Sequence, residues 1–169
     1  MNIISKFTVG SEEGISDLIT IIDSSVYAMY KVLVPEEDIK GYISNDIDPR
    51  KMINDLNDLS TQLIITYLDG KPVGYSILKS GTAHSSVPEG KRATEMNFVI
   101  LPEFDSSEIR DSLWKKSKAA TSFTDIIWIN MMSHDPLTDY LKESGFTVGT
   151  DAVAGPFKLP SQILQFNKS

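Results

Sequence analysis

The chain has 169 residues, which suits one folded domain and is short for two, and 41% of them are hydrophobic, enough to bury a sizeable core. Its 16 basic and 23 acidic residues give a formal net charge of −7 and form no basic cluster, which argues against a nucleic-acid-binding protein. The absence of cysteine excludes disulfides, and two histidines 50 residues apart give no support to a metal site.

No apolar run approaches the length needed to cross a membrane. The first ten residues carry one lysine and no long apolar core, so they do not form a secretory signal, and we expect a cytoplasmic protein. The acidic balance would favour a cationic small molecule such as a polyamine. It would equally serve solubility, and both explanations stay open.

The N-terminal third predicts one strand followed by helices. Residues 3–9 alternate apolar and polar, which indicates a strand. Ser11 then opens a helix that Pro35 ends, and Asp48 with Pro49 starts another after a short acidic helix. The first of these helices carries a long apolar stripe, formed by Ile15, Leu18, Ile19, Ile22, Val26, Met29, Tyr30 and Leu33.

The middle of the chain has the period of strands. Residues 63–67 and 72–78 flank an Asp69-Gly70 hairpin turn, and residues 93–101 form a third strand that Pro102 closes. The polar loop between the second and third of these strands holds His84, which we expect to be solvated.

The C-terminal third alternates helices and strands. We expect a helix over 105–120, a central strand over 125–132, a short helix over 137–144 that stops at Gly145, and a closing strand pair over 146–153 and 162–166. Trp114 and Trp128 are expected in the core. The whole order predicts an α/β (α+β) fold with a mixed central sheet of about seven strands and four or five helices, in a single domain over 1–169.

Four segments resemble one family in order and spacing. They are LDGKPVGYSIL at 68–78, FVILPEF at 98–104, IIWINMM at 126–132 and YLKESGF at 140–146. Together they resemble the GNAT superfamily of acyl-CoA N-acyltransferases over residues 3–166. The paired N-terminal helices and Phe157 in AGPFKL are similar to a bacterial subgroup that includes polyamine-type N-acetyltransferases.

The resemblance implies an enzyme that moves an acetyl group from acetyl-CoA to a primary amine of a small molecule or peptide, such as a polyamine, and that forms a homodimer. It implies Glu95 as general base, Tyr140 as general acid, and Val99 and Ile100 as backbone contacts to the acyl group and pantetheine. The family's acid falls by position on Leu141, one residue after Tyr140. His134 stands where the family often carries an asparagine, and we expect it to contact the cofactor.

The loop that binds the CoA pyrophosphate in the family departs from its pattern. The family's Gln/Arg-x-x-Gly-x-Gly/Ala falls on Asp105, Ser106, Ser107, Glu108, Ile109 and Arg110, where only the apolar Ile109 fits. Asp105 and Glu108 instead predict a capping box, in which the carboxylates satisfy the helix's own first N–H groups. A second hypothesis therefore stands beside the enzyme: a catalytically inactive GNAT-fold binding or interaction module that has lost CoA affinity.

Overall fold

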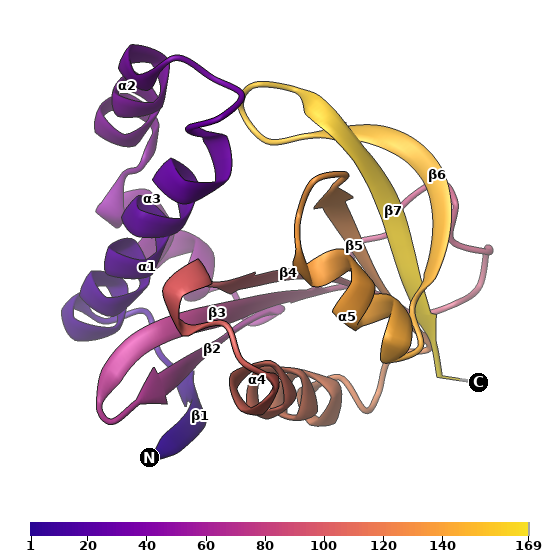
Figure 1. The fold of residues 1–169 in the computed structure, drawn as a ribbon. Helices are drawn as coiled ribbons and strands as arrows, with labels where there is room; N and C mark the ends of the chain where they lie inside the picture. Colours follow the sequence, from indigo (N-terminus) through magenta and orange to yellow (C-terminus); the bar gives the residue numbers. More distant parts are fainter. Residues whose placement is uncertain (169) are drawn as a thin grey trace. The chain divides into compact units, whose positions relative to one another are not determined.

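A computed structural model describes residues 1–168, with the helices and strands in the predicted order. Figure 1 shows their course from the N-terminus to the C-terminus. The strands are β1 (Ile3–Thr8), β2 (Thr61–Leu68), β3 (Lys71–Ser80), β4 (Ala93–Ile100), β5 (Ile126–Met132), β6 (Thr147–Ala154) and β7 (Leu159–Asn167). The helices are α1 (Glu12–Tyr30), α2 (Glu36–Asp46), α3 (Pro49–Leu56), α4 (Ser107–Ala120) and α5 (Leu137–Glu143), with a 3₁₀ turn, η1, at Pro102–Phe104.

The strands form one mixed sheet, as predicted, in the order β1-β2-β3-β4-β5-β7-β6. β1 pairs with β2, β5 with β7 and β6 with β7 in antiparallel ladders, whereas β4 and β5 run parallel. The parallel ladder pairs Ala93 with Ile126, Thr94 with Ile127 and Glu95 with Trp128. In the described part of the chain, no helix is long and apolar enough to cross a membrane, and no group of three or more acidic or histidine side chains is placed to hold a metal ion.

The chain divides into two compact units. The first contains residues 1–77 and 98–120, and the second contains residues 78–97 and 121–169. β3 and β4 each run from one unit into the other. The single domain over 1–169 stays a prediction.

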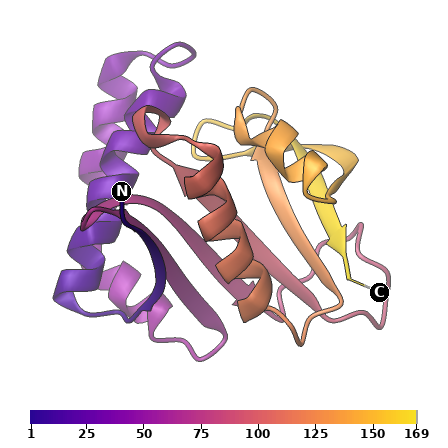
Figure 2. The ribbon, with the colours of Figure 1, turned by 60° about the horizontal axis from the view of Figure 1, so that its bottom comes forward.

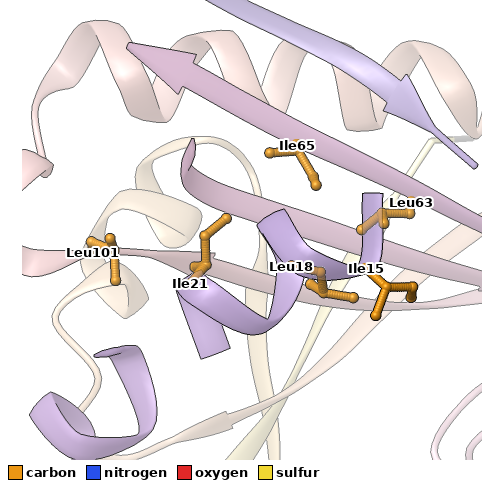
Figure 3. Packing of buried hydrophobic residues seen from close by; sticks show 6 residues of the cluster. All are labelled: Ile15, Leu18, Ile21, Leu63, Ile65 and Leu101. Carbon is orange, nitrogen blue, oxygen red and sulfur yellow. The ribbon is translucent and has the colours of Figure 1, made fainter. Parts of the chain in front are cut away.

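The core of the first unit forms where α1 packs against β2. Ser11 caps α1 by accepting a hydrogen bond from the Gly14 N–H at 3.3 Å, as its sequence position predicts. Figure 3 shows the side chains that meet there, which are Ile15, Leu18, Ile21, Leu63, Ile65 and Leu101. The predicted stripe missed Ile21, which is fully buried, and wrongly included Leu33, which is 52% exposed because α1 ends at Tyr30.

Helix α4 belongs to the same unit and packs on β1 and β2, where it is the coral helix of Figure 2. Three hydroxyls join the elements: Ser5 lies 2.7 Å from both Thr66 and Ser112. Trp114 of α4 is buried, as predicted. These contacts fix the direction in which α4 leaves η1, and hence the position of its first turn.

The second unit is built around β5, which is buried along nearly its whole length, as predicted. Trp128 packs with Ala93 and Ile163 and is core, as expected. Gly145 ends α5 with a φ of 114°, and a Cβ there would lie 2.9 Å from the Phe166 ring, so only glycine fits this stop.

Three partly or fully buried tyrosines of the first unit make its stability sensitive to alkali. Burial raises the pKa of Tyr30 to about 12 and raises the pKa of Tyr75 well above its ordinary 10.0. Burial, together with the hydrogen bond that Tyr67 donates to Asp17 at 2.7 Å, raises the pKa of Tyr67 in the same direction.

Because these phenols ionise more readily in the unfolded chain, their contribution to the free energy of unfolding is complete below about pH 10 and is lost as pH rises through the folded values. We expect the melting temperature to fall between pH 9 and pH 12. The melting temperature of a Tyr67→Phe, Tyr75→Phe double variant should fall less over that range than that of the wild type. An identical fall in both proteins would contradict the role given to these tyrosines.

Candidate functional site

The residues singled out by sequence fall into two groups on the two units. Glu95, His134 and Tyr140 lie in the second unit, and Val99, Ile100 and residues 105–110 lie in the first. The surroundings of each group therefore come from the residues of its own unit.

The first turn of α4 is capped one residue later than predicted. The Oγ of Ser106 accepts a hydrogen bond from the Ile109 N–H at 3.2 Å, so Ser106 occupies the cap position and Ile109 the third helical position. The predicted capping box is wrong, because Asp105 closes the preceding 3₁₀ turn, with its backbone N–H on the Pro102 carbonyl. The cap residue was misplaced because aspartate and serine are equally good caps in sequence.

Glu108 nevertheless covers the helix start with its carboxylate. Hydrogen bonding from the backbone N–H of the same residue, and then from the hydroxyls of Ser107 and Ser106, lowers the pKa of the Glu108 carboxyl from its ordinary 4.5. The positive end of the helix dipole favours the same ionised form. The start of α4 thus favours an ionised Glu108, and its Ile109 amide is bonded by Ser106.

Asp105 binds Arg110 instead of the helix amides. The Nε and Nη2 atoms of Arg110 lie 2.6 and 2.8 Å from the two carboxylate oxygens, a bidentate pair. The side chains are 31% and 15% exposed, so the pair is partly withdrawn from water. The cationic side chain of the loop is therefore neutralised within the loop, which sequence position alone did not indicate.

These residues do not fit a pyrophosphate held by bare backbone amides. Such a site needs open N–H groups and glycines that let the phosphates approach. Here the Ile109 amide is engaged by Ser106, Asp105 is paired, and the exposed Glu108 carboxylate carries the same sign of charge as a phosphate. Like charges at close range repel, although exposure to water screens part of the repulsion.

Val99 and Ile100 lie at the end of β4 against β3. Val99 is half-buried and packs on the α1 core, and Ile100 is buried. The backbone of β3 comes very close at Gly74, where a Cβ would lie 2.9 Å from the Val99 carbonyl oxygen. Their contacts to an acyl group and pantetheine stay a prediction.

Glu95 lies on β4 among apolar neighbours, half-buried, directly across the ladder from Trp128. Side chains of registered residues point to the same face of a sheet, and Ala93, two residues earlier, packs with Trp128 on that face. The carboxyl of Glu95 is thus on the Trp128 face of the second unit. Its role as a base stays a prediction.

The loop between β3 and β4 covers the same face, which sequence reasoning missed. Trp128 Nε1 donates a hydrogen bond to the Thr82 carbonyl at 2.8 Å, and the His84 ring lies 5.2 Å from the Trp128 ring. The Nδ1 of His84 is 2.8 Å from the Ser86 hydroxyl, which Gln165 of β7 also contacts at 2.8 Å. The expectation of a solvated His84 is wrong, because its ring is half-buried against Trp128, a residue that is 44 positions away in the sequence.

Tyr140 lies within α5, and His134 lies in the turn before it. Leu141 is fully buried while Tyr140 is half-buried, so these neighbours face different surroundings, as one residue of helical rotation requires. His134 is exposed in the turn before α5. The side chain that caps this turn is Asp135, whose carboxylate accepts from the Leu137 N–H at 2.9 Å. The Asp135-Pro136 pair carried that signal in the sequence.

The structure resembles solved acetyltransferases over nearly its whole length. The PaiA N-acetyltransferase of Thermoplasma acidophilum, in complex with coenzyme A, matches with a TM-score of 0.74 at 16% identity, over 99% of each chain. YncA of Salmonella typhimurium, with its cofactor acetyl-CoA, matches with a TM-score of 0.71 at 13% identity, over 100% of this chain and 95% of that one. The ribosomal-protein-alanine N-acetyltransferase of Brucella melitensis matches with a TM-score of 0.68 at 13% identity, over 97% and 99%.

These likenesses establish that the chain has the fold of the GCN5-related (GNAT) N-acetyltransferases, as its sequence motifs predicted. No protein-family model matches the chain, and no match was found among curated proteins. The polyamine-type subgroup stays a prediction.

The arrangement at α4 predicts the effect of neutralising Glu108. Glu108→Gln removes the repelling charge and loosens its hold on the helix amide, so we expect about tenfold or greater tighter binding of coenzyme A, measured by calorimetry, on the rule that about 1.4 kcal/mol is tenfold. Glu103→Gln, an exposed acid in η1, is the matched control and should leave affinity unchanged. Equal affinities for wild type and Glu108→Gln would contradict the effect.

Proposed function

We propose that the chain is an N-acetyltransferase that moves an acetyl group from acetyl-CoA to a primary amine of a small molecule or peptide. The observation that supports it is the likeness, over 97–100% of this chain, to acetyltransferase structures, among them one with coenzyme A and one with acetyl-CoA. The acidic balance of −7 suits an acceptor that arrives as a cation, polyamines included. A cytoplasmic homodimer is part of the same proposal.

In this proposal Glu95 accepts the proton that the acceptor ammonium must lose before its nitrogen can attack. The amine then forms the C–N bond as the C–S bond of the thioester breaks, and Tyr140 donates a proton to the departing thiolate. The nitrogen sheds its second proton as it becomes an amide, and through solvent that proton restores the Tyr140 phenol. Backbone N–H groups at Val99 and Ile100 hold the acyl oxygen and the pantetheine. His134 contributes a further contact to the acyl donor.

Glu95 suits this task by its setting. It is the one ionisable side chain of β4, and it is half-buried on the face where Ala93 packs with Trp128. Its registered neighbour on that face is Trp128 of β5. The other residues registered between β4 and β5 include no second carboxylate. A base of this kind works best where it is sheltered yet within reach of a ligand.

A second candidate is a GNAT-fold binding module that no longer binds coenzyme A. The observation that favours it is the first turn of α4, where Ser106 bonds the Ile109 amide, the Glu108 carboxyl has a lowered pKa, and Asp105 neutralises Arg110. In that case the scaffold would serve an interaction without catalysis.

Thermal unfolding with acetyl-CoA separates the two candidates. Ligand at 100 times its Kd adds about 2.7 kcal/mol to the free energy of unfolding, roughly a 5 to 10 °C rise in melting temperature for a chain of this size. We expect a rise at millimolar acetyl-CoA that reaches only part of this value because of Glu108. No rise at all would select the binding module.

The catalytic part of the proposal is tested by release of free thiol in the presence of amines. Glu95→Gln should lower kcat by about 10²-fold or more, the usual contribution of a positioned base, while leaving the acetyl-CoA-induced rise in melting temperature intact. Glu89→Gln, an exposed acid of the β3–β4 loop, is the matched control. Undiminished thiol release by Glu95→Gln would remove Glu95 from the mechanism.

A further inference from the structure

His84 is held in one tautomer by its neighbours. The backbone N–H of Ser86 donates to Nδ1 at 3.2 Å, and a nitrogen that accepts a hydrogen bond carries no proton. The Ser86 hydroxyl lies 2.8 Å from the same Nδ1, and the Gln165 amide nitrogen donates to this hydroxyl at 2.8 Å, which leaves the hydroxyl hydrogen for Nδ1. The neutral ring must therefore carry its hydrogen on Nε2.

The Nε2–H is a donor without a protein acceptor. Over residues 1–168, the hydrogen bonds of the imidazole all go to Nδ1, and the side chain is half-buried, so Nε2 faces either solvent or a ligand. A histidine that served only the packing of the loop would not need this orientation fixed by two bonds and a supporting amide.

The ring is also fixed in place. It lies 5.2 Å from the Trp128 ring at an interplanar angle of 47°, and Trp128 is pinned by its bond to the Thr82 carbonyl and by burial with Ala93 and Ile163. A donor that is already oriented loses little conformational entropy when it binds an acceptor. The Nε2–H of His84 thus has the properties of a preorganised hydrogen-bond donor.

Trp128 relates Glu95 to His84, by strand register on one side and by a ring contact on the other. Glu95 is the ladder partner of Trp128, on the face where Ala93 packs, and His84 covers Trp128 from the β3–β4 loop. A carboxylate that receives a proton and a neutral donor that binds an oxygen are thereby presented on one face of the second unit.

We propose that His84 Nε2–H binds a carbonyl oxygen next to the acceptor amine, and that the acceptor is an α-amino amide or a peptide N-terminus. This inference rests on the proposed acetyl transfer with Glu95 as base. A neutral donor suits a neutral oxygen, whereas the carboxylate of a free amino acid would meet Glu95 and a chain of net charge −7. A polyamine has no oxygen to offer to this donor.

The test compares two acceptors that differ in the oxygen. Alaninamide and isopropylamine both carry an amine on a methyl-substituted carbon, and only alaninamide has a neighbouring carbonyl. His84→Phe keeps an aromatic ring on Trp128 and removes the donor. We expect kcat/KM for alaninamide to fall about five- to tenfold in His84→Phe, the effect of one hydrogen bond, and kcat/KM for isopropylamine to stay within twofold.

The possible outcomes distinguish a failure of the role of His84 from a failure of the proposed acetyl transfer. An equal fall for both amines, or no fall for either, overturns the role of His84 while transfer itself stands. No thiol release with any amine overturns the proposed function and the inference with it.

A second measurement needs no variant. The chain has two histidines, and the nitrogen resonances of their rings report which nitrogen carries hydrogen. We expect the neutral ring of His84 to be the Nε2–H tautomer, and addition of alaninamide in the presence of acetyl-CoA to shift the Nε2 resonance more than that of Nδ1. The Nδ1–H tautomer would overturn the inference even if His84→Phe does not fold.

Discussion

At the start of α4 the Ser106 hydroxyl bonds the Ile109 amide and the Glu108 carboxyl is held in its ionised form, and the expected affinity for an anionic cofactor depends on that arrangement. A helix start with open N–H groups can bind an anion, whereas a helix start whose N–H groups already bond side chains has fewer donors to offer. Ser106 bonds the Ile109 amide, hydrogen bonding at the helix start lowers the pKa of the Glu108 carboxyl, and Asp105 neutralises Arg110. The chain therefore combines the fold of acetyltransferases with a helix start at which we expect a pyrophosphate to bind weakly.

The fold followed from local patterns in the sequence. The Asp69-Gly70 turn, the apolar run of β5 and the stop at Gly145 each act within a few residues, and the structure places all three as predicted. The error on α1 came from periodicity alone, because a stripe drawn through Ile22 and Leu33 does not reveal that the chain leaves the helix after Tyr30.

The candidate site was less predictable from the sequence. Some of its contacts join residues far apart in the chain, and at the start of α4 two neighbouring residues could each have been the cap. Asp105 and Ser106 are interchangeable as caps in sequence, and only the pairing of Asp105 with Arg110 decides between them. The ring that His84 packs against is 44 residues away at Trp128, and Gln165, which donates to the Ser86 hydroxyl beside it, is 79 residues from Ser86, so neither contact belongs to a local pattern. Glu95 could be singled out because a carboxyl in an apolar strand is itself unusual.

The amide proton of Glu108 tests the central claim most directly. If its own carboxylate accepts a bond from this N–H, the amide proton resonance follows the carboxyl as it titrates, with a midpoint below the ordinary 4.5, in the free protein. The account predicts that shift and only slight change on addition of micromolar coenzyme A. If the Glu108 amide proton resonance does not change on acid titration, yet shifts strongly with micromolar coenzyme A, the helix start is an open anion site and the account is contradicted.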